Sequence, residues 1–182
     1  MKKFALFYLL LLVSLSVLSA GPFGIEMGQS VDTLKRNNLR LELLEGTSNF
    51  YIVVPKISHP VLEFVGVFIG EDGGVIQIVA QSSNFKDSGY GKSIRLAFTD
   101  IKNSIDSLLG PSVFIDWIES DSKLADPEDW LASIDYGDRY YFAIWADYTD
   151  ASLPEDIGEI TLLVDAYSRS EGFVRLEFVK SE

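Results

Sequence analysis

The chain has 182 residues, with 15 Lys and Arg against 27 Asp and Glu, which gives a formal net charge of −12 at pH 7. It contains no cysteine and one histidine, which excludes disulfides, zinc–thiolate centres, iron–sulfur clusters and sites built from several histidines. Hydrophobic residues make up 47% of the chain, which is enough apolar surface for a folded core and excludes a disordered or low-complexity protein.

Residues 1–20 have the three parts of a secretory signal peptide. Met1–Lys3 is basic, residues 4–18 form an apolar run without a charge, and Ser19-Ala20 supplies small residues. The run is shorter than the ~20 residues of a membrane-spanning helix, so a retained anchor is the less favoured alternative. Cleavage after Ala20 fits best, and cleavage after Ser19 fits nearly as well. Removing residues 1–20 takes away two lysines and leaves 162 residues with a charge of 13 − 27 = −14.

The composition of the mature chain predicts an exported bacterial protein, either periplasmic or secreted. Export without a disulfide or an Asn-x-Ser/Thr sequon favours a bacterial envelope over a eukaryotic secretory pathway. No later stretch is apolar enough to span a membrane, so we expect no stable span after cleavage. The negative charge disfavours nucleic acid and anionic membranes. We expect the partner to be another envelope protein, one with a basic surface.

The sequence pattern after residue 20 predicts a two-layer α+β fold, with an antiparallel sheet and helices on one face. Ser30 is a suitable N-cap for a first helix, and Gly110-Pro111 ends a second, amphipathic one. Its apolar stripe consists of Ile94, Phe98, Ile101, Ile105 and Leu108. The expected helices are 31–37 and 94–109. The expected strands are 39–44, 49–54, 61–69, 75–81, 113–118, 140–146, 160–167 and 173–179.

Residues 21–182 are expected to form a single domain with two half-repeats, 23–82 and 88–182. Three segment pairs occur in the same order in both halves. They are Gly28–Val31 with Gly91–Ile94, Tyr51–Val54 with Tyr141–Ile144, and Gly74–Ile78 with Gly172–Leu176. Chance similarity between alternating strands is the alternative explanation, and the sequence leaves both open.

Candidates for catalysis are few. A catalytic His59 would need a nucleophile and an orienting acid brought close by folding, and no G-x-S-x-G elbow is present, so we favour a structural histidine. Paired carboxylates could support a hydrolase, but with 27 acidic residues their presence has little specificity. We therefore assign no catalytic residue and expect a protein that is not an enzyme. An envelope hydrolase and a small-ligand carrier remain as alternatives.

Metal and nucleotide binding have little support. The acidic segments Asp147–Asp156 and Asp121–Asp129 lack the ligand spacing and the central glycine of an EF-hand, so solvated loops are favoured over calcium sites. Neither a P-loop nor a dinucleotide-binding glycine motif is present. We expect no metal and no cofactor.

The segment that most suggests a binding function is residues 130–141, with Trp117 shortly before it. It carries aromatic side chains beside acidic ones and lies where the second half of the chain is longer than the first. Tyrosine and tryptophan next to charged groups are typical of protein-binding surfaces. Core packing of these rings is the alternative, because they bury large areas. The predicted interaction surface consists of Trp117, Trp130, Tyr136, Asp138 and Tyr140.

The segment Phe23-Gly-Ile-Glu-Met-Gly-Gln-Ser30, with its Phe-Gly-x-x-x-Gly-x-Ser pattern, resembles the opening of small uncharacterised exported bacterial proteins. The helix-plus-meander halves are similar to modules of the β-lactamase-inhibitor-like and outer-membrane-assembly accessory families. The resemblance implies binding to proteins rather than catalysis. The chain departs from both families, because it lacks the lipid-anchoring cysteine of one and the disulfides of the other. The expected function is that of a non-catalytic protein-binding module, such as an inhibitor, an immunity protein or an envelope accessory factor.

Overall fold

A computed structural model describes residues 21–37 and 39–182, so the expected signal peptide lies outside the described residues. The fold is α+β, as predicted. Its helical segments are η1 (Pro22–Gly24), α2 (Val31–Arg36), α3 (Lys92–Leu109), η2 (Pro127–Asp129) and α4 (Trp130–Asp135). Its strands are β1 (Arg40–Leu43), β2 (Phe50–Val54), β3 (Leu62–Ile69), β4 (Val75–Ser82), β5 (Phe85–Lys86), β6 (Val113–Ile118), β7 (Arg139–Ala146), β8 (Ile157–Ser168) and β9 (Glu171–Lys180).

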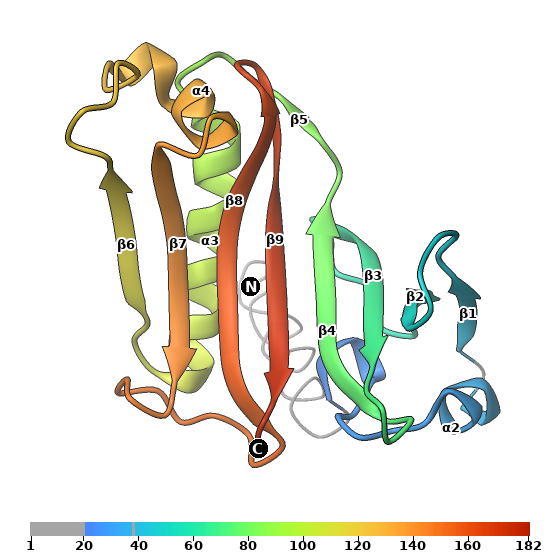
Figure 1. The fold of residues 1–182 in the computed structure, drawn as a ribbon. Coiled ribbons are helices and arrows are strands. Elements are labelled where there is room, and N and C mark those ends of the chain that lie inside the picture. The colour runs from blue at the N-terminus through green and yellow to red at the C-terminus, as the bar shows by residue number, and fades with distance from the viewer. Residues whose placement is uncertain (1–20, 38) are drawn as a thin grey trace, which may run out of the picture.

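The nine strands of the described residues belong to one antiparallel sheet. Its order is β1-β2-β3-β4-β9-β8-β7-β6, and the short β5 pairs with β9 beside this path. In Figure 1 the edge strands β1 and β6 lie at opposite sides of the molecule, and α3 lies behind the second half of the sheet. The order places the candidate surface at one edge, because β6 and β7 are the last two strands of the path.

The sheet consists of two four-stranded meanders, each preceded by a helix. The meanders β1–β4 and β6–β9 meet where β4 pairs with β9, and Val79 lies opposite Glu177 at the centre of this ladder. The three pairs of similar segments occupy corresponding places in the two halves. The first pair leads into α2 and α3, the second pair lies on β2 and β7, and the third pair lies at the start of β4 and β9. A common origin of the two halves stays a prediction.

Helix α3 supplies the largest helical contribution to the core. Ile94, Phe98 and Ile101 of the predicted stripe are buried. At the end of the helix Leu109 is buried, whereas Leu108 is 43% exposed, contrary to the expected stripe. Leu108 and Leu109 both lie about one turn after the half-buried Ile105, at the two edges of the buried stripe, and at the end of the helix it is Leu109 that packs in the core.

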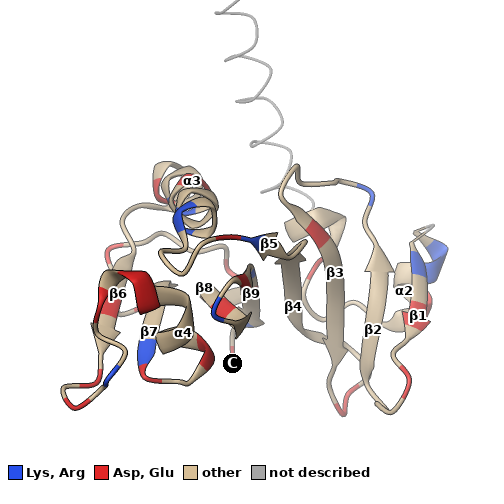
Figure 2. Cartoon of the chain, turned by 90° about the horizontal axis from the view of Figure 1, so that it is seen from above, with Lys and Arg blue, Asp and Glu red and all other residues tan. Residues whose placement is uncertain are grey.

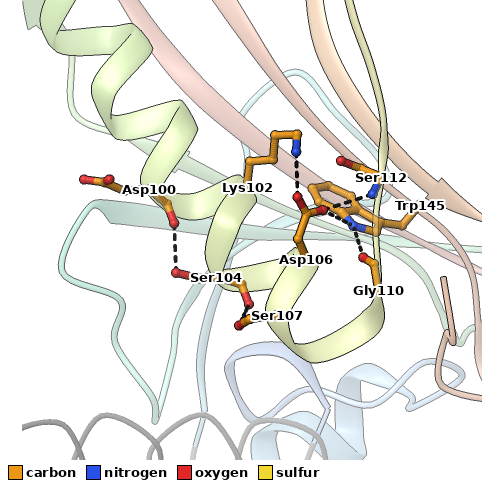
Figure 3. Close-up of polar contacts among 8 residues, drawn as sticks. All are labelled: Asp100, Lys102, Ser104, Asp106, Ser107, Gly110, Ser112 and Trp145. Carbon is orange, nitrogen blue, oxygen red and sulfur yellow. Dashed lines mark hydrogen bonds and ion pairs between the residues drawn. The ribbon is translucent and has the colours of Figure 1, made fainter. Parts of the chain in front are cut away.

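A polar network joins the end of α3 to the sheet (Figure 3). The Asp106 carboxylate accepts hydrogen bonds from Lys102 Nζ at 2.6 Å, from the Ser112 backbone N–H at 3.0 Å and from Trp145 Nε1 at 3.0 Å. Partial burial raises the pKa of Asp106, but the hydrogen bonds from Lys102 and Ser112 outweigh this and lower it below its usual value. The network fixes the turn that leads from α3 into β6.

Candidate functional site

Two predicted surface residues, Trp117 and Tyr140, form an exposed aromatic pair. They lie opposite each other in the β6–β7 ladder, with ring centroids 5.5 Å apart. Trp117 is 51% exposed and Tyr140 is 48% exposed. Their neighbour Phe114 points the other way, because its ring packs 5.9 Å from Phe98 of α3. The pair therefore lies on the sheet face that α3 does not cover.

Two carboxylates follow the aromatic pair along the same strands. The Glu119 backbone N–H donates to the Asp138 carbonyl at 2.9 Å, so these residues extend the ladder by one step beyond its last pair, Ile118 and Arg139. Side chains two residues apart on a strand share a face, which places Glu119 beside Trp117. The Asp138 carboxylate accepts a hydrogen bond from Ser122 Oγ at 2.6 Å, which holds the loop after β6 close to β7.

An open depression of ≈ 470 Å³ lies at this end of the sheet. Tyr136, Asp138 and Glu119 line it together with residues of the loop after β6 and Arg169. Tyr136 is 73% exposed and follows α4 directly. The structure thus brings four of the five predicted residues to one region: Trp117 and Tyr140 on the sheet, and Tyr136 and Asp138 in the adjoining depression.

The prediction for Trp130 is wrong, because this side chain is 2% exposed and belongs to the hydrophobic core. Its ring packs 5.1 Å from the ring of Tyr141, and the Arg95 guanidinium lies 5.3 Å from its centroid. The large aromatic side chain of Trp130 suggested a binding residue, but it packs in the core, which was the alternative explanation. Trp130 anchors α4, so the short helix holds Tyr136 at a fixed place on the surface.

The region around the aromatic pair is strongly acidic. Residues 113–138 contain eight Asp and Glu and a single Lys, a charge of 1 − 8 = −7 within a chain of −12. Figure 2 shows acidic positions on β6, on α4 and on the loops beside them. Arg139 neutralises Asp116, with its Nη1 2.6 Å from the carboxylate, and Arg169 pairs with Asp129, so the region together with these two arginines carries 3 − 8 = −5. The other acidic groups leave a negative field that attracts cationic partners.

His59 has a structural role in the connection between β2 and β3. Its Nδ1 accepts hydrogen bonds from the backbone N–H groups of Val61 at 3.1 Å and Leu62 at 3.2 Å. Desolvation by burial lowers the pKa of His59. The neutral ring therefore caps the start of β3, in agreement with the structural interpretation favoured from the sequence.

This cap predicts a pH dependence of stability. The folded-state pKa lies below the unfolded value of 6.5, so the stabilisation is present above pH 6.5 and is lost as the pH falls through the folded-state pKa. We expect the free energy of unfolding in urea to decrease between about pH 7 and pH 5. The variant His59→Asn should flatten this slope, because an amide oxygen can accept the same bonds without titrating. An equal slope in both proteins would contradict the assignment.

The other described residues include a second depression but no cluster that could bind a metal ion. A second open depression, of ≈ 630 Å³, lies between the β7–β8 loop and the end of β9, and His59 lines neither depression. Residues 21–37 and 39–182 hold no cluster of three or more His, Asp or Glu that could bind a metal ion. Among the helices of the same residues, none is long and apolar enough to cross a membrane.

The sequence prediction missed α4 and the contribution of Glu119. A signal for the helix was present, because Asp126-Pro127-Glu128-Asp129 has the proline and the early acidic residues of a helix start. Glu119 had no signal of its own, since its place beside Trp117 depends on the ladder continuing past the end of β6.

Comparison of the chain with protein-family models, with curated protein sequences and with solved structures found no match.

Proposed function

We propose that the protein is a non-catalytic, exported binding module of the bacterial envelope, which engages a basic protein partner through the surface around Trp117 and Tyr140. The observation that carries the proposal is the half-exposed Trp117–Tyr140 pair with Glu119 and Asp138 next to it in the same ladder. Tryptophan and tyrosine dominate the binding energy of many interfaces, and neighbouring charges select the partner.

The rigidity of this region supports the proposal. Trp117 and Tyr140 stand on paired strands, the loop after β6 is tied to Asp138 through Ser122, and α4 is anchored by Trp130. A surface that is already ordered loses little conformational entropy when it binds. The adjoining depression is open, and charged residues lie among those that line it, which favours a protein surface over a small apolar ligand.

The charge of the region specifies the kind of partner. The net charge of −5 that residues 113–138 carry together with Arg139 and Arg169 accelerates the encounter with a basic protein and repels acidic ones. Export is supported by the composition of residues 1–20, which would bring the protein to the same compartment as envelope proteins. An inhibitor, an immunity protein or an assembly accessory factor would each act in this way.

The test is capture of a stoichiometric partner from an envelope extract of the native host, with the exported protein as bait, at low and high salt. We expect Trp117→Ala to weaken binding by about tenfold or more, because it truncates an aromatic anchor. Tyr148→Ala is the matched control, since Tyr148 is an aromatic residue that is 69% exposed beyond the far end of β7. Equal loss in both variants, or capture that is insensitive to salt, would count against the proposed surface.

A further inference from the structure

The outer side of β6 is a free sheet edge. Within residues 21–37 and 39–182, β6 pairs only with β7, and it ends the strand order of the sheet. The strand has six residues, which corresponds to an edge of about 20 Å. Val113, Phe114 and Trp117 on this strand are each at least 44% exposed. An edge of this kind presents unpaired N–H and C=O groups that can pair with another chain.

The two edges of the sheet differ in how they resist such pairing. The opposite edge, β1, has four residues and exposes the charged side chains of Arg40 and Glu42. Neither strand contains lysine or proline and neither ladder has a bulge, but β6 is longer than β1, with six residues. Its one charged residue, Asp116, is neutralised by Arg139. Short length and unpaired charged side chains, which protect an edge strand from pairing, are therefore present on β1 and missing from β6.

The ladder determines which backbone groups of β6 are free. The hydrogen bond from the Glu119 N–H to the Asp138 carbonyl makes this a hydrogen-bonded pair of the antiparallel ladder. Such pairs recur at every second residue, so Val113, Ile115 and Trp117 direct their N–H and C=O groups toward β7. It follows that Phe114, Asp116 and Ile118 direct theirs outward, and these three amides identify the free edge.

We infer that β6 binds an extended segment of a basic polypeptide, which adds to the sheet as a further strand. Backbone hydrogen bonds to Phe114, Asp116 and Ile118 would supply affinity, and alternate side chains of the added strand would lie beside Trp117. The charge of the region selects a cationic segment, because Glu119 and Asp121 follow the carboxyl end of β6 and the neighbourhood, with Arg139 and Arg169 included, carries −5. The inference rests on the proposed function and specifies how its partner is recognised.

The test uses a short, end-blocked peptide of alternating lysine and valine, titrated into the exported protein and followed by amide hydrogen exchange resolved by NMR. At saturation we expect exchange at Phe114, Asp116 and Ile118 to slow by about tenfold or more, since these amides gain acceptors. Exchange at Val113, Ile115 and Trp117 should change little, because their amides already face β7. Exchange that slows on another strand, or at no residue, would overturn the inference.

Two peptide controls separate the backbone contribution from the charge contribution. A peptide with glutamate in place of lysine should bind at least tenfold more weakly at low salt, because it meets the acidic surface with like charge. A peptide N-methylated at alternate residues keeps its charge but loses the donors that face β6, and it should not slow exchange at the three amides. Equal binding of all three peptides would contradict strand addition.

Substitutions on β6 separate this inference from the proposed function. Ile118→Pro removes an outward-facing donor at a position where an edge strand tolerates proline, and Ile118→Val is the matched control with an intact backbone. We expect Ile118→Pro to abolish the peptide effect while thermal unfolding shows a folded protein. If Trp117→Ala loses the envelope partner and Ile118→Pro retains it, the proposed function stands and strand addition fails. If neither variant loses it, the proposed function fails.

A second copy of the chain is the competing occupant of this edge. In that case the amides of Phe114, Asp116 and Ile118 would be protected from hydrogen exchange without any peptide, and this protection would disappear when the protein is diluted. This result would overturn the inference in favour of self-association. The net charge of −12 opposes such an assembly, since two copies would bring their acidic regions together.

Discussion

Replacing Trp145 with alanine is expected to lower the free energy of unfolding by about 3–5 kcal/mol. Trp145 is completely buried on β7, and its indole Nε1 donates to Asp106 at 3.0 Å and to the Gly110 carbonyl at 3.2 Å. The substitution leaves a large cavity and takes a donor from the network in Figure 3. For a chain of this size we expect the melting temperature to fall by about 10 °C or more, which calorimetry would measure.

Trp117→Ala is the matched control, because it removes the same atoms from a side chain that is 51% exposed. We expect it to cost about 1 kcal/mol or less, most of it from the lost contact with Tyr140. Together the two variants separate the functions of two tryptophans: one should affect stability, and the other should affect binding. Similar losses of stability in both would show that Trp117 is part of the core after all.

Replacing Gly91 with alanine is expected to lower the free energy of unfolding by about 2–5 kcal/mol, since two separate effects add. Gly91 has φ +61°, a left-handed conformation that L-residues adopt at a cost of about 1–2 kcal/mol. An added Cβ would also lie 2.3 Å from Cε3 of the buried Trp130 ring, which has no room to move. Urea unfolding of the variant measures the total.

Gly137→Ala isolates the backbone effect, because Gly137 has φ +80° and no atom lies within 4 Å of its added Cβ. We expect this control to lower the free energy of unfolding by about 1–2 kcal/mol, which is the cost of the left-handed backbone conformation alone. A double-mutant cycle gives a second check, since Trp130→Ala removes the ring and Gly91→Ala should then cost no more than the control. An additive cycle would contradict the packing of Trp130 on Gly91.

The secondary structure could be predicted well wherever the hydrophobic pattern was strictly periodic. The strand expected at 113–118 has these bounds in the structure, and the other expected strands differ from the observed ones by at most a few residues at either end. The two-residue β5 was missed because it is too short to show alternation. Helix α4 was missed because it is almost entirely buried and so lacks the polar face that marks an amphipathic helix.

The candidate site could be predicted in composition but not in geometry. Aromatic and acidic residues pointed to one region of the chain, yet tryptophan alone does not show whether a ring packs inward, as Trp130 does, or outward, as Trp117 does. The difference arises from tertiary context, because Trp130 fills the space above Gly91 whereas Trp117 stands on the uncovered face. The free edge of β6 depends on strand order, which the local pattern does not contain.

The ladder between β4 and β9 has a consequence for the order of folding. Gln77 on β4 and Glu177 on β9 are 100 residues apart in the chain, so β4 has no neighbour on that side until the whole second half has emerged. Closing such a long loop is slow, and an unpaired central strand can associate with other unfinished chains in the meantime. We therefore expect the joining of the halves to be a late step of folding, and the chain to be most prone to aggregation just before β9 pairs with β4.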